Sequence, residues 1–575
     1  MRTDGSTPQG RTRRIVGIAV AAAAVTIAVL VPETWFASDP RMTVHLDPPF
    51  RPISLFRSLL MLDALLALGW SAGWPLWPSR RPAGGPAAVV AGVPAEPGVR
   101  RPLLWLGLIF LGAAALRLHG LDAQLWLDEA AVLVGLGDRS VLDTLFATPT
   151  LNNHLLYTLS MLVSTGLFGA EAWAARLPAA LAGIATVPAV YALARLALSE
   201  RDSLLAASLV AVSYHHVFFS QNARGYSLLL LWSVVATTMF LRALEHDTDR
   251  EWALYGLASL LGCATMLFGV FVPAGHALVW AVLWARRRWS GERGLAFGGR
   301  PLVVWGFVGL AVLHLYAGAL PWVLSIAADQ ASGAAPAYRI SQWERLGQLW
   351  RGLLAGLGGI AIAALGVVLV PTVAALPAFV RRQPVFTLAL TAPLLLEAVV
   401  VVRLAWSPRF FLVALPVAAV LGIGAASTWR RGRFLPVLVV AVFTLVSFLS
   451  LPRYYRIPKQ ASRDGLAWIA ARARPGDVVV AVDTARWGAA FYAPRVAPAL
   501  EMTAVRSRSG LETVEDRHRD GTVWLLTSFE PALRVELPDL YGWIVRDYRP
   551  VRRFPATVED GEITIWTSAP GAIDR

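Results

Sequence analysis

The chain has 575 residues, of which 56% are hydrophobic and 16% are charged, a composition too apolar for an ordinary soluble protein of this length. Its formal net charge of +14 could indicate nucleic-acid binding. The arginines cluster between apolar blocks, however, and positive charge beside cytoplasmic helix ends explains this arrangement without nucleic acid. Cys263 is the only cysteine, which excludes an intrachain disulfide and a cysteine metal cluster.

Thirteen apolar blocks of membrane-spanning length are expected to form helices. The first follows Arg11, Arg13 and Arg14, and its length favours an uncleaved helix with a cytoplasmic N-terminus over a secretory signal peptide. The blocks lie near residues 15–31, 54–73, 102–118, 177–198, 203–219, 226–243, 252–265, 267–285, 301–321, 352–373, 385–402, 410–427 and 434–451.

Residues 252–285 are too long for one spanning helix, and the positions of the arginines decide how often they cross the membrane. A single crossing would place the later clusters at 381–382 and 430–433 outside the cytoplasm. Two crossings keep every strong arginine cluster inside, so we predict two helices here. With this topology the stretches expected outside the cytoplasm are 119–176, 220–224, 322–351, 403–409 and the tail beyond 451.

The chain divides into three regions by composition. Residues 1–101 are predicted to form a transmembrane hairpin followed by a Pro/Gly/Ala-rich linker. Residues 102–451 form the main transmembrane body, and residues 452–575 are predicted to be a small extracytoplasmic α/β domain. The elements expected in this last domain are a helix at 465–474 and strands at 478–482, 523–526 and 562–566. The fold class is therefore mostly α, with a small C-terminal α/β domain.

Asp128 and Glu129 follow the apolar block 102–118 and are flanked by apolar residues. Adjacent carboxylates at a membrane surface can accept a proton, hold a metal or bind a cationic group. Partial burial makes a carboxylate a better proton acceptor. A pair of solvated loop residues is the alternative, and the residues alone do not decide between the two.

Three further polar residues could contact a substrate. Asn153 and His154 lie between Pro149 and an apolar stretch, where an asparagine can equally cap a helix. His216 lies in an aromatic segment that also fits the belt of aromatic residues at a membrane interface.

Two arginines, Arg224 and Arg409, lie on the predicted outer side, against the usual charge distribution. Such a cation usually has an anionic partner. The planar guanidinium matches phosphate oxygens, so a lipid phosphate is the natural candidate. For Arg409, contact with ordinary lipid headgroups is the alternative.

Four short patterns together resemble the C-type (GT-C) integral membrane glycosyltransferases. The resemblance is to the branch of glycosyltransferase family 39, with protein O-mannosyltransferases and the aminoarabinose transferase of lipid A, and it covers residues 103–450. Many relatives have an acidic residue at the position of Asn222. The patterns are Arg117…Gly120-Leu121…Trp126-Leu127-Asp128-Glu129, Phe168-Gly169…Arg176-Leu177-Pro178, Ser220-Gln221-Asn222-Ala223-Arg224-Gly225-Tyr226 and Pro408-Arg409-Phe410-Phe411 with Pro416.

The resemblance implies transfer of a sugar, with inversion, from a polyprenyl-phosphate donor to an extracytoplasmic glycan, lipid or protein acceptor. It implies that Asp128 is the catalytic base and that Glu129 orients it, the acceptor or a metal. Arg224 and Arg409 would then bind the donor phosphate, with support from Tyr226. No cofactor is firmly implied, and a divalent cation at Asp128 and Glu129 stays open.

These expectations place the chain in a bacterial inner membrane as a multi-pass enzyme, with the lipid bilayer, the lipid-linked donor and the acceptor as partners and with no nucleic acid. A polytopic transporter or a lipid-linked glycan flippase or ligase is the alternative. A transporter is expected to carry charges at mid-membrane depth, whereas here ionisable residues gather at helix ends, with Glu397 as the main exception.

Overall fold

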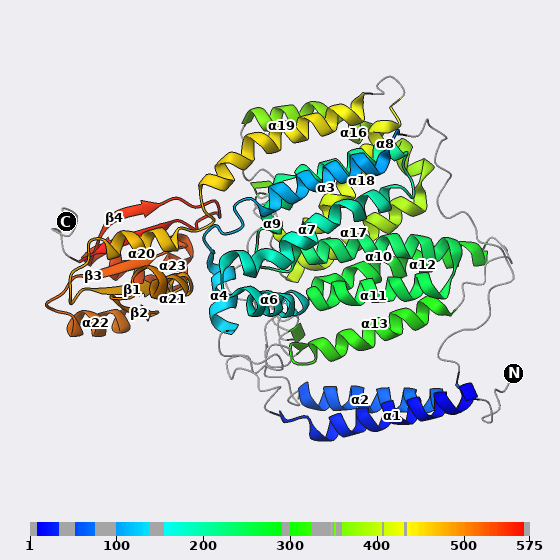
Figure 1. The fold of residues 1–575 in the computed structure, drawn as a ribbon, viewed down its shortest axis with the longest axis horizontal. Coiled ribbons are helices and arrows are strands. Elements are labelled where there is room, and N and C mark those ends of the chain that lie inside the picture. The colour runs from blue at the N-terminus through cyan, green and yellow to red at the C-terminus, as the bar shows by residue number, and fades with distance from the viewer. Residues whose placement is uncertain are drawn as a thin grey trace.

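A computed structural model describes most of the chain, and most of that part is helical. The described residues are 8–33, 52–74, 99–136, 154–289, 299–320, 323–324, 347, 350–351, 359–404, 408–429 and 434–568. Figure 1 shows the helices packed side by side in one body, with a small sheet at one end. The predicted fold class, mostly α with a small C-terminal sheet, is confirmed at this level. The proposed linker at 74–101 lies almost entirely outside the described residues.

In the part of the chain that the structure describes, eight helical segments are long and apolar enough to cross a membrane. A ninth would be the pair α8 and α9, which is bent by 57° between its two halves. The eight segments are Gly10–Leu30 in α1, Pro52–Ser71 (α2), Ala172–Ala194 (α7), Tyr226–His246 (α10), Leu267–Arg286 in η3 and α12, Ile362–Arg382 in α16, Arg409–Ser427 in η4 and α18, and Leu435–Arg456 (α19).

Other helices complete the body. The bounds that the eight segments do not already give are α1 Pro8–Leu30, α3 Pro102–Leu118, α4 Leu127–Leu136, α6 Leu155–Phe168, α8 Glu200–Val212, α9 Tyr214–Ser220, α11 Asp249–Thr265, η3 Leu267–Val270, α12 Phe271–Trp289, α13 Arg300–Tyr316, α16 Gly359–Arg382, α17 Pro384–Leu404, η4 Pro408–Val413 and α18 Ala414–Ser427. Local capping accounts for several starts: the Ser199 hydroxyl accepts from the Asp202 amide at α8, and Thr248 accepts from Glu251 at α11.

The structure revises several predicted segments. The two helices predicted within 252–285 are confirmed, with the break at Met266. The block at 203–219 is not one straight helix, because it bends at Ser213. The stretch 119–176, expected outside the cytoplasm, contains α4, the apolar helix α6 and the start of α7, and its side of the membrane stays a prediction. The helix expected at 352–373 appears as α16, which continues to Arg382.

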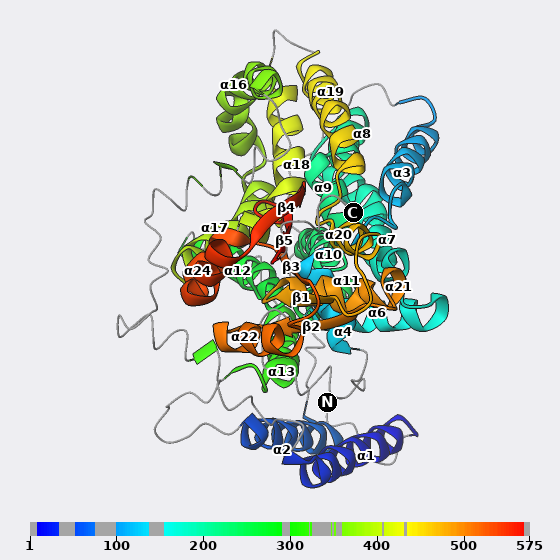
Figure 2. The same ribbon diagram turned by 90° about the vertical axis from the view of Figure 1, so that its left-hand side faces the viewer.

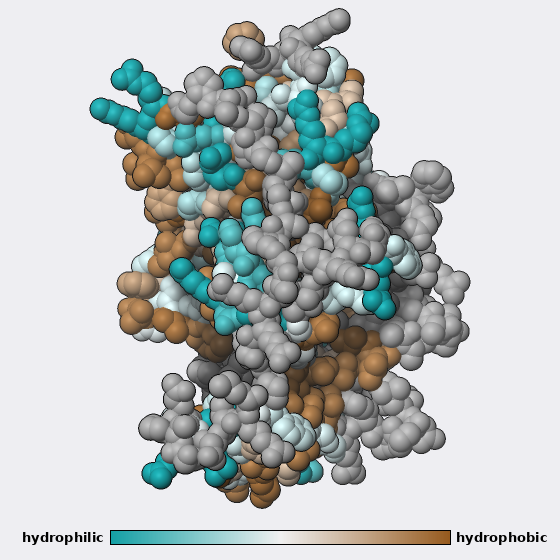
Figure 3. Space-filling model, turned by 90° about the vertical axis from the view of Figure 1, so that its right-hand side faces the viewer, coloured by the Kyte–Doolittle hydropathy of each residue, from teal (hydrophilic) through white to brown (hydrophobic). Residues whose placement is uncertain are grey.

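Large apolar side chains on the outer helices face away from the body, whereas α7 and α10 bury small and aliphatic residues inside it. In α3 the exposed residues include Leu103, Trp105 and Leu111, a pattern that fits contact with lipid. Figure 3 shows the face opposite the sheet, where hydrophilic residues gather between bands of hydrophobic surface. The chain is thus a multi-pass membrane protein by helix length and composition.

The hairpin of α1 and α2 lies beside α13 (Figure 1). One ion pair joins them, between Asp63 of α2 and His314 of α13 at 3.0 Å. Ala317 also packs against apolar residues of the hairpin.

The C-terminal unit has a five-stranded mixed sheet in the order β2-β1-β3-β5-β4. Strand β1 pairs in parallel with β2 and β3, whereas β5 pairs antiparallel with β3 and β4. The three predicted strands appear as β1 (Val478–Val482), β3 (Val523–Thr527) and β5 (Ile563–Thr567). The predicted helix is α20 (Ser462–Ala470), and the further elements are α21 Ala485–Val496, β2 Glu501–Val505, α22 Arg508–Arg517, α23 Glu530–Glu536, α24 Pro538–Asp547 and β4 Arg549–Phe554.

The C-terminal unit packs on the loop and helix that carry Asp128. Helix α21 contacts α4, and Leu125 and Ala130 lie in the same apolar cluster as residues of the sheet. The Tyr492 hydroxyl accepts from the Leu125 amide at 2.7 Å. The Gln124 side chain accepts from the Arg463 amide at 2.8 Å. Figure 2 shows the sheet lying across the ends of the helices, so this unit helps to position the segment 121–136.

Candidate active site

Arg176 fixes the loop that leads into α4. Its guanidinium, 1% exposed, donates to the backbone oxygens of Leu121, Ala123 and Gln124. Its Nε and Nη2 donate to the two carboxylate oxygens of Glu129, at 2.8 and 2.6 Å. A bidentate pair of this kind sets the orientation of both side chains. The start of α4 is therefore held against α7.

Glu129 is fully buried, and its carboxylate is already occupied. Besides Arg176, it accepts from the backbone amide of Ala223 at 2.6 Å and from that of Trp126 at 3.2 Å. Burial alone would raise the pKa of Glu129, but the charges of Arg176 and Lys459 and the hydrogen bonds outweigh it and lower the pKa to about 2. The contact with Ala223 joins α4 to the turn between α9 and α10.

Lys459 reaches the same carboxylate from the start of the C-terminal unit. Its Nζ lies 3.8 Å from Glu129 Oε1, donates to the backbone oxygen of Gln221 and lies over the ring of Phe218. Burial lowers the pKa of Lys459 to about 7, although the charge of Glu129 opposes this. One lysine thus connects the C-terminal unit, α4 and the turn at 221–225.

Arg117 supports the turn at 221–225. This buried arginine donates to the backbone oxygens of Val210 and Ala211 at 3.1 and 2.9 Å, where the bend between α8 and α9 leaves carbonyl groups without helical partners. The Gln221 amide donates to the Arg117 oxygen at 2.9 Å. Gly225 is needed for close packing, because a Cβ there would lie 2.8 Å from Thr265.

Asp128, the neighbour of Glu129 in the first turn of α4, has a different partner. Its Oδ2 accepts from Arg409 Nη1 at 3.0 Å, and its side chain remains 16% exposed. Arg409 belongs to η4, which is 281 residues further along the chain. The side chain of Arg409 is 33% exposed, and its Nε has no hydrogen-bond partner among the described residues. The pair therefore retains donor capacity that a ligand could use.

His154 and Arg224 present donors beside this pair. The Gly225 amide donates to His154 Nδ1 at 2.8 Å, so the ring proton is assigned to Nε2. Burial and the charges of Arg224 and Arg409 hold the pKa of His154 well below its usual range, which keeps the ring neutral. The Nε2 atom lies 3.5 Å from Arg224 Nη2. Two neighbouring donors of this kind suit an oxyanion.

Tyr226 completes the group. Its ring meets the ring of His154 edge-on, with centroids 5.2 Å apart. Its hydroxyl is buried and lies within electrostatic range of Arg409, Arg224 and Asp128. The structure thus brings together five residues singled out in the sequence: Asp128, His154, Arg224, Tyr226 and Arg409.

The other candidates lie elsewhere. The Glu129 carboxylate faces Arg176 and Ala223, not the exposed side. His216 contacts Arg117 at 2.8 Å and the oxygen of Val210, within the bend between α8 and α9. Asn153 lies outside the described residues.

Sequence reasoning assigned no role to Arg176 or Lys459, the two cations that hold Glu129. The signal for Arg176 was the one that pointed to Arg224, namely an arginine on the predicted outer side. Lys459 is the only lysine of the chain, but nothing in its neighbourhood predicts that it reaches back to α4.

The described residues do not fit a cation shared by Asp128 and Glu129. Both oxygens of Glu129 already accept from Arg176 and from backbone amides. The nearby Asn222 presents an amide whose oxygen accepts from the Trp126 ring at 3.3 Å. In the part of the chain that the structure describes, no group of three or more His, Cys, Asp or Glu side chains has an arrangement that could hold a metal ion.

Residues 155–310 match the model of a protein family described as dolichyl-phosphate-mannose-protein mannosyltransferase. The matched segment runs from α6 to α13 and includes Arg176, Arg224 and Tyr226. The predicted resemblance to GT-C glycosyltransferases is confirmed by this match. No curated protein matches the chain.

Several solved structures are similar at low identity. ArnT from Cupriavidus metallidurans in the apo state has 14% identity and a TM-score of 0.48, covering 82% of this chain and 99% of that one. The oligosaccharyltransferase AglB from Archaeoglobus fulgidus, in complex with an inhibitory peptide and a dolichol-phosphate, has 14% identity and a TM-score of 0.47, covering 78% and 72%.

Proposed function

We propose that this chain is an inverting membrane glycosyltransferase that moves a sugar from a polyprenyl-phosphate donor to an extracytoplasmic acceptor. The observation that carries the proposal is the contact between Asp128 and Arg409, 3.0 Å apart and partly exposed, beside the donors of His154 and Arg224. A base and a phosphate-binding group lie next to each other there, on helix ends of a membrane protein. The family match over residues 155–310 supports the same activity.

In the proposed reaction, the donor phosphate binds to Arg224 and Arg409. The guanidinium of Arg409 then turns from the Asp128 carboxylate to the phosphate oxygens, which frees Asp128 to accept a proton. The acceptor hydroxyl attacks the anomeric carbon from the side opposite the phosphate, the bond from that carbon to the phosphate oxygen breaks, and the proton passes to Asp128. The departing polyprenyl phosphate takes the electron pair of that bond and so gains a second negative charge, which the two arginines stabilise.

His154 and Tyr226 support the phosphate in this scheme. A neutral His154 with its proton on Nε2 donates a hydrogen bond without adding charge, and the buried Tyr226 hydroxyl is a second neutral donor. Glu129 acts as a positioning residue, because its buried pair with Arg176 fixes the start of α4, where Asp128 lies. His216, which contacts Arg117 and Val210, and Asn153, which lies outside the described residues, stay candidates for substrate binding.

The proposed topology has about thirteen crossings in a bacterial inner membrane, with the C-terminal unit outside the cytoplasm. We keep the division into a hairpin and linker (1–101), a catalytic body (102–451) and a C-terminal domain (452–575). The packing of the C-terminal unit on α4, through α21, supports this orientation, since the C-terminal domain and the site then lie on the same side of the body. The lipid bilayer, the lipid-linked donor and a glycan, lipid or protein acceptor are the proposed partners.

Analysis of lipid-linked sugars in a strain that lacks the gene tests the proposal. We expect an unused polyprenyl-phosphate sugar to accumulate and to disappear when the wild-type gene is restored. If the protein were a transporter or flippase, its loss would leave the lipid-linked sugar on the wrong side of the membrane. The purified protein would then consume no lipid-linked sugar. Failure of the purified protein to consume any lipid-linked sugar would exclude the enzymatic proposal.

A further inference from the structure

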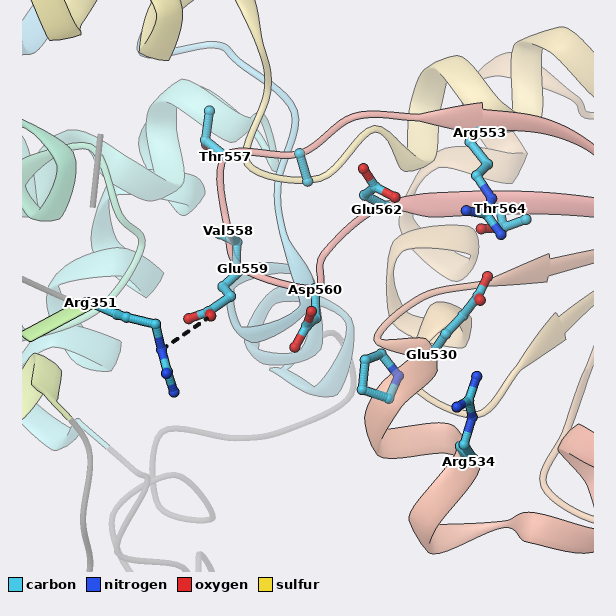
Figure 4. A pocket seen from close by; sticks show the side chains of 12 residues that line it. Arg351, Glu530, Arg534, Arg553, Thr557, Val558, Glu559, Asp560, Glu562 and Thr564 are labelled. Carbon is cyan, nitrogen blue, oxygen red and sulfur yellow. Dashed lines mark ion pairs between the residues drawn. The ribbon is translucent and has the colours of Figure 1, made fainter. Parts of the chain in front are cut away.

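An open cavity of about 800 Å³, whose charged lining residues are mostly exposed, lies in the C-terminal unit, and Asp128 is not part of its wall. Its wall is formed by β5, by the connection from β4 to β5 and by α23, and Arg351 reaches it from the membrane body (Figure 4). The volume lies within the range of about 300–1,000 Å³ that is usual for ligand sites. The cavity is therefore large enough for a ligand and lies at the junction of the two parts of the molecule.

The cavity is lined by carboxylates and guanidiniums in nearly equal number. The carboxylates are those of Glu530, Glu559, Asp560 and Glu562, and the guanidiniums are those of Arg351, Arg534 and Arg553. The Thr557 hydroxyl in the same wall is buried and has no hydrogen-bond partner among the described residues. Nearly balanced charge does not favour an anion or a cation, whereas a mixture of hydrogen-bond acceptors and donors suits a ligand with many hydroxyl groups.

The wall of the cavity is joined to the candidate active site through two residues. The Thr557 and Val558 amides donate to the backbone oxygens of Pro458 and Lys459, at 3.0 and 3.4 Å. The Lys459 ammonium in turn lies 3.8 Å from Glu129, the residue next to Asp128. A molecule held in the cavity would therefore lie on an element that directly contacts the start of α4.

From these observations we infer that the cavity binds the sugar acceptor, and that this acceptor carries a neutral, hydroxyl-rich glycan. The inference rests on the proposed function and narrows its acceptor to a glycan or a glycan-bearing molecule. The carboxylates accept hydrogen bonds from sugar hydroxyls and the arginines donate to ring and hydroxyl oxygens. The C-terminal domain is then the part of the protein that selects the acceptor.

The test uses the full-length purified protein, the lipid extract that carries the unused polyprenyl-phosphate sugar, and membranes of the deletion strain as the source of acceptor. The double substitution Asp560→Asn and Glu562→Gln keeps side-chain size but removes two negative charges. Asparagine also tolerates the positive φ of 57° at position 560. A matched control is Glu512→Gln with Asp516→Asn, which removes two carboxylates from α22 outside the cavity.

We expect the cavity variant to need roughly tenfold more acceptor membrane for half-maximal transfer. A tenfold change corresponds to the loss of one good polar contact. Its binding of undecaprenyl phosphate, measured by native mass spectrometry, and its thermal unfolding should match those of wild type and control. An unchanged acceptor requirement would refute the inference, and so would a lower one, which would indicate an anionic acceptor. If the double variant does not fold, Glu562→Gln alone serves with the same readouts. Absence of transfer by the wild type would refute the proposed function instead.

Discussion

Two neighbouring carboxylates, Asp128 and Glu129, lie in opposite surroundings. Glu129 is fully buried, and Arg176, Lys459 and two backbone amides surround it. Asp128 is partly exposed and forms an ion pair with Arg409, on a distant segment. Two acidic residues adjacent in sequence can therefore have different roles: the buried one fixes the position of the helix, and the other stays accessible to a ligand.

Asp128→Asn should have the largest effect on activity. The amide cannot accept the acceptor proton, and general base catalysis typically contributes about 10²–10⁴-fold. We expect transfer by the purified protein to fall by that factor while thermal unfolding stays as in wild type. Asp122→Asn, in the exposed part of the same loop, is the control and should retain full activity. Normal turnover by Asp128→Asn would remove Asp128 as the base.

Glu129→Gln should act on stability first. The substitution leaves Arg176 buried without its counter-charge, and breaking such a pair costs about 3–5 kcal/mol. We expect a clear drop in the unfolding temperature of the protein in detergent. Glu171→Gln, at the exposed start of α7, is the control. Wild-type stability together with lost activity would mean that Glu129, and not only Asp128, takes part in the chemistry.

Arg224→Ala should weaken binding of the donor more than binding of the acceptor. Hydrogen bonds to a charged group contribute about 1.5–3 kcal/mol, so we expect undecaprenyl phosphate to bind roughly 10–100-fold more weakly. The measurement is native mass spectrometry at several lipid concentrations. Arg242→Ala, near the other end of α10 and paired with Glu251, should bind the lipid as wild type does. Equal loss in both variants would remove Arg224 from the phosphate site.

The pH dependence of the unfolding free energy should reveal the lowered pKa of Lys459. Its pKa is about 7 in the folded protein and about 10.4 in an unfolded chain. Between these values the unfolded state binds one more proton, so folding becomes more favourable as pH rises, by up to about 1.4 kcal/mol per pH unit. We expect the unfolding free energy of wild type to rise relative to Lys459→Met from pH 7 to 10. Parallel curves for the two proteins would contradict the assigned environment of Lys459.

Tyr492→Phe should have the smallest effect. It removes the acceptor for the Leu125 amide, a loss of about 1 kcal/mol. A small decrease in unfolding temperature, with transfer retained, is expected. Tyr541→Phe, whose hydroxyl contacts exposed Arg534, is the control. A large loss of transfer in Tyr492→Phe alone would show that the C-terminal unit controls the site more strongly than its contacts suggest.

Much of the fold follows from local sequence, because apolar block length and β-rich runs are local signals. The break within 252–285 and strands β1, β3 and β5 are such cases. The bend at Ser213 was not predicted, because it depends on Arg117, about a hundred residues earlier, which binds the carbonyl groups it exposes. Helix α6 was missed because a mostly apolar stretch of 14 residues is shorter than the length that spans a membrane.

The candidate site divides in the same way. Residue type and the charge rule pointed to Asp128, Arg224 and Arg409 singly. Their meeting, and the capture of Glu129 by Arg176 and Lys459, depends on contacts between residues 47 to more than 300 positions apart. No local pattern encodes such distances. Only the folded chain distinguishes a carboxylate whose oxygens are already paired from one that is still accessible.

A cryo-EM structure of the full chain with undecaprenyl phosphate would test the central claim most directly. We expect phosphate oxygens within hydrogen-bond distance of Arg224 and Arg409, with the Arg409 guanidinium turned away from Asp128 and the Glu129–Arg176 pair unchanged. A phosphate bound elsewhere, with the Asp128–Arg409 contact intact, would contradict it.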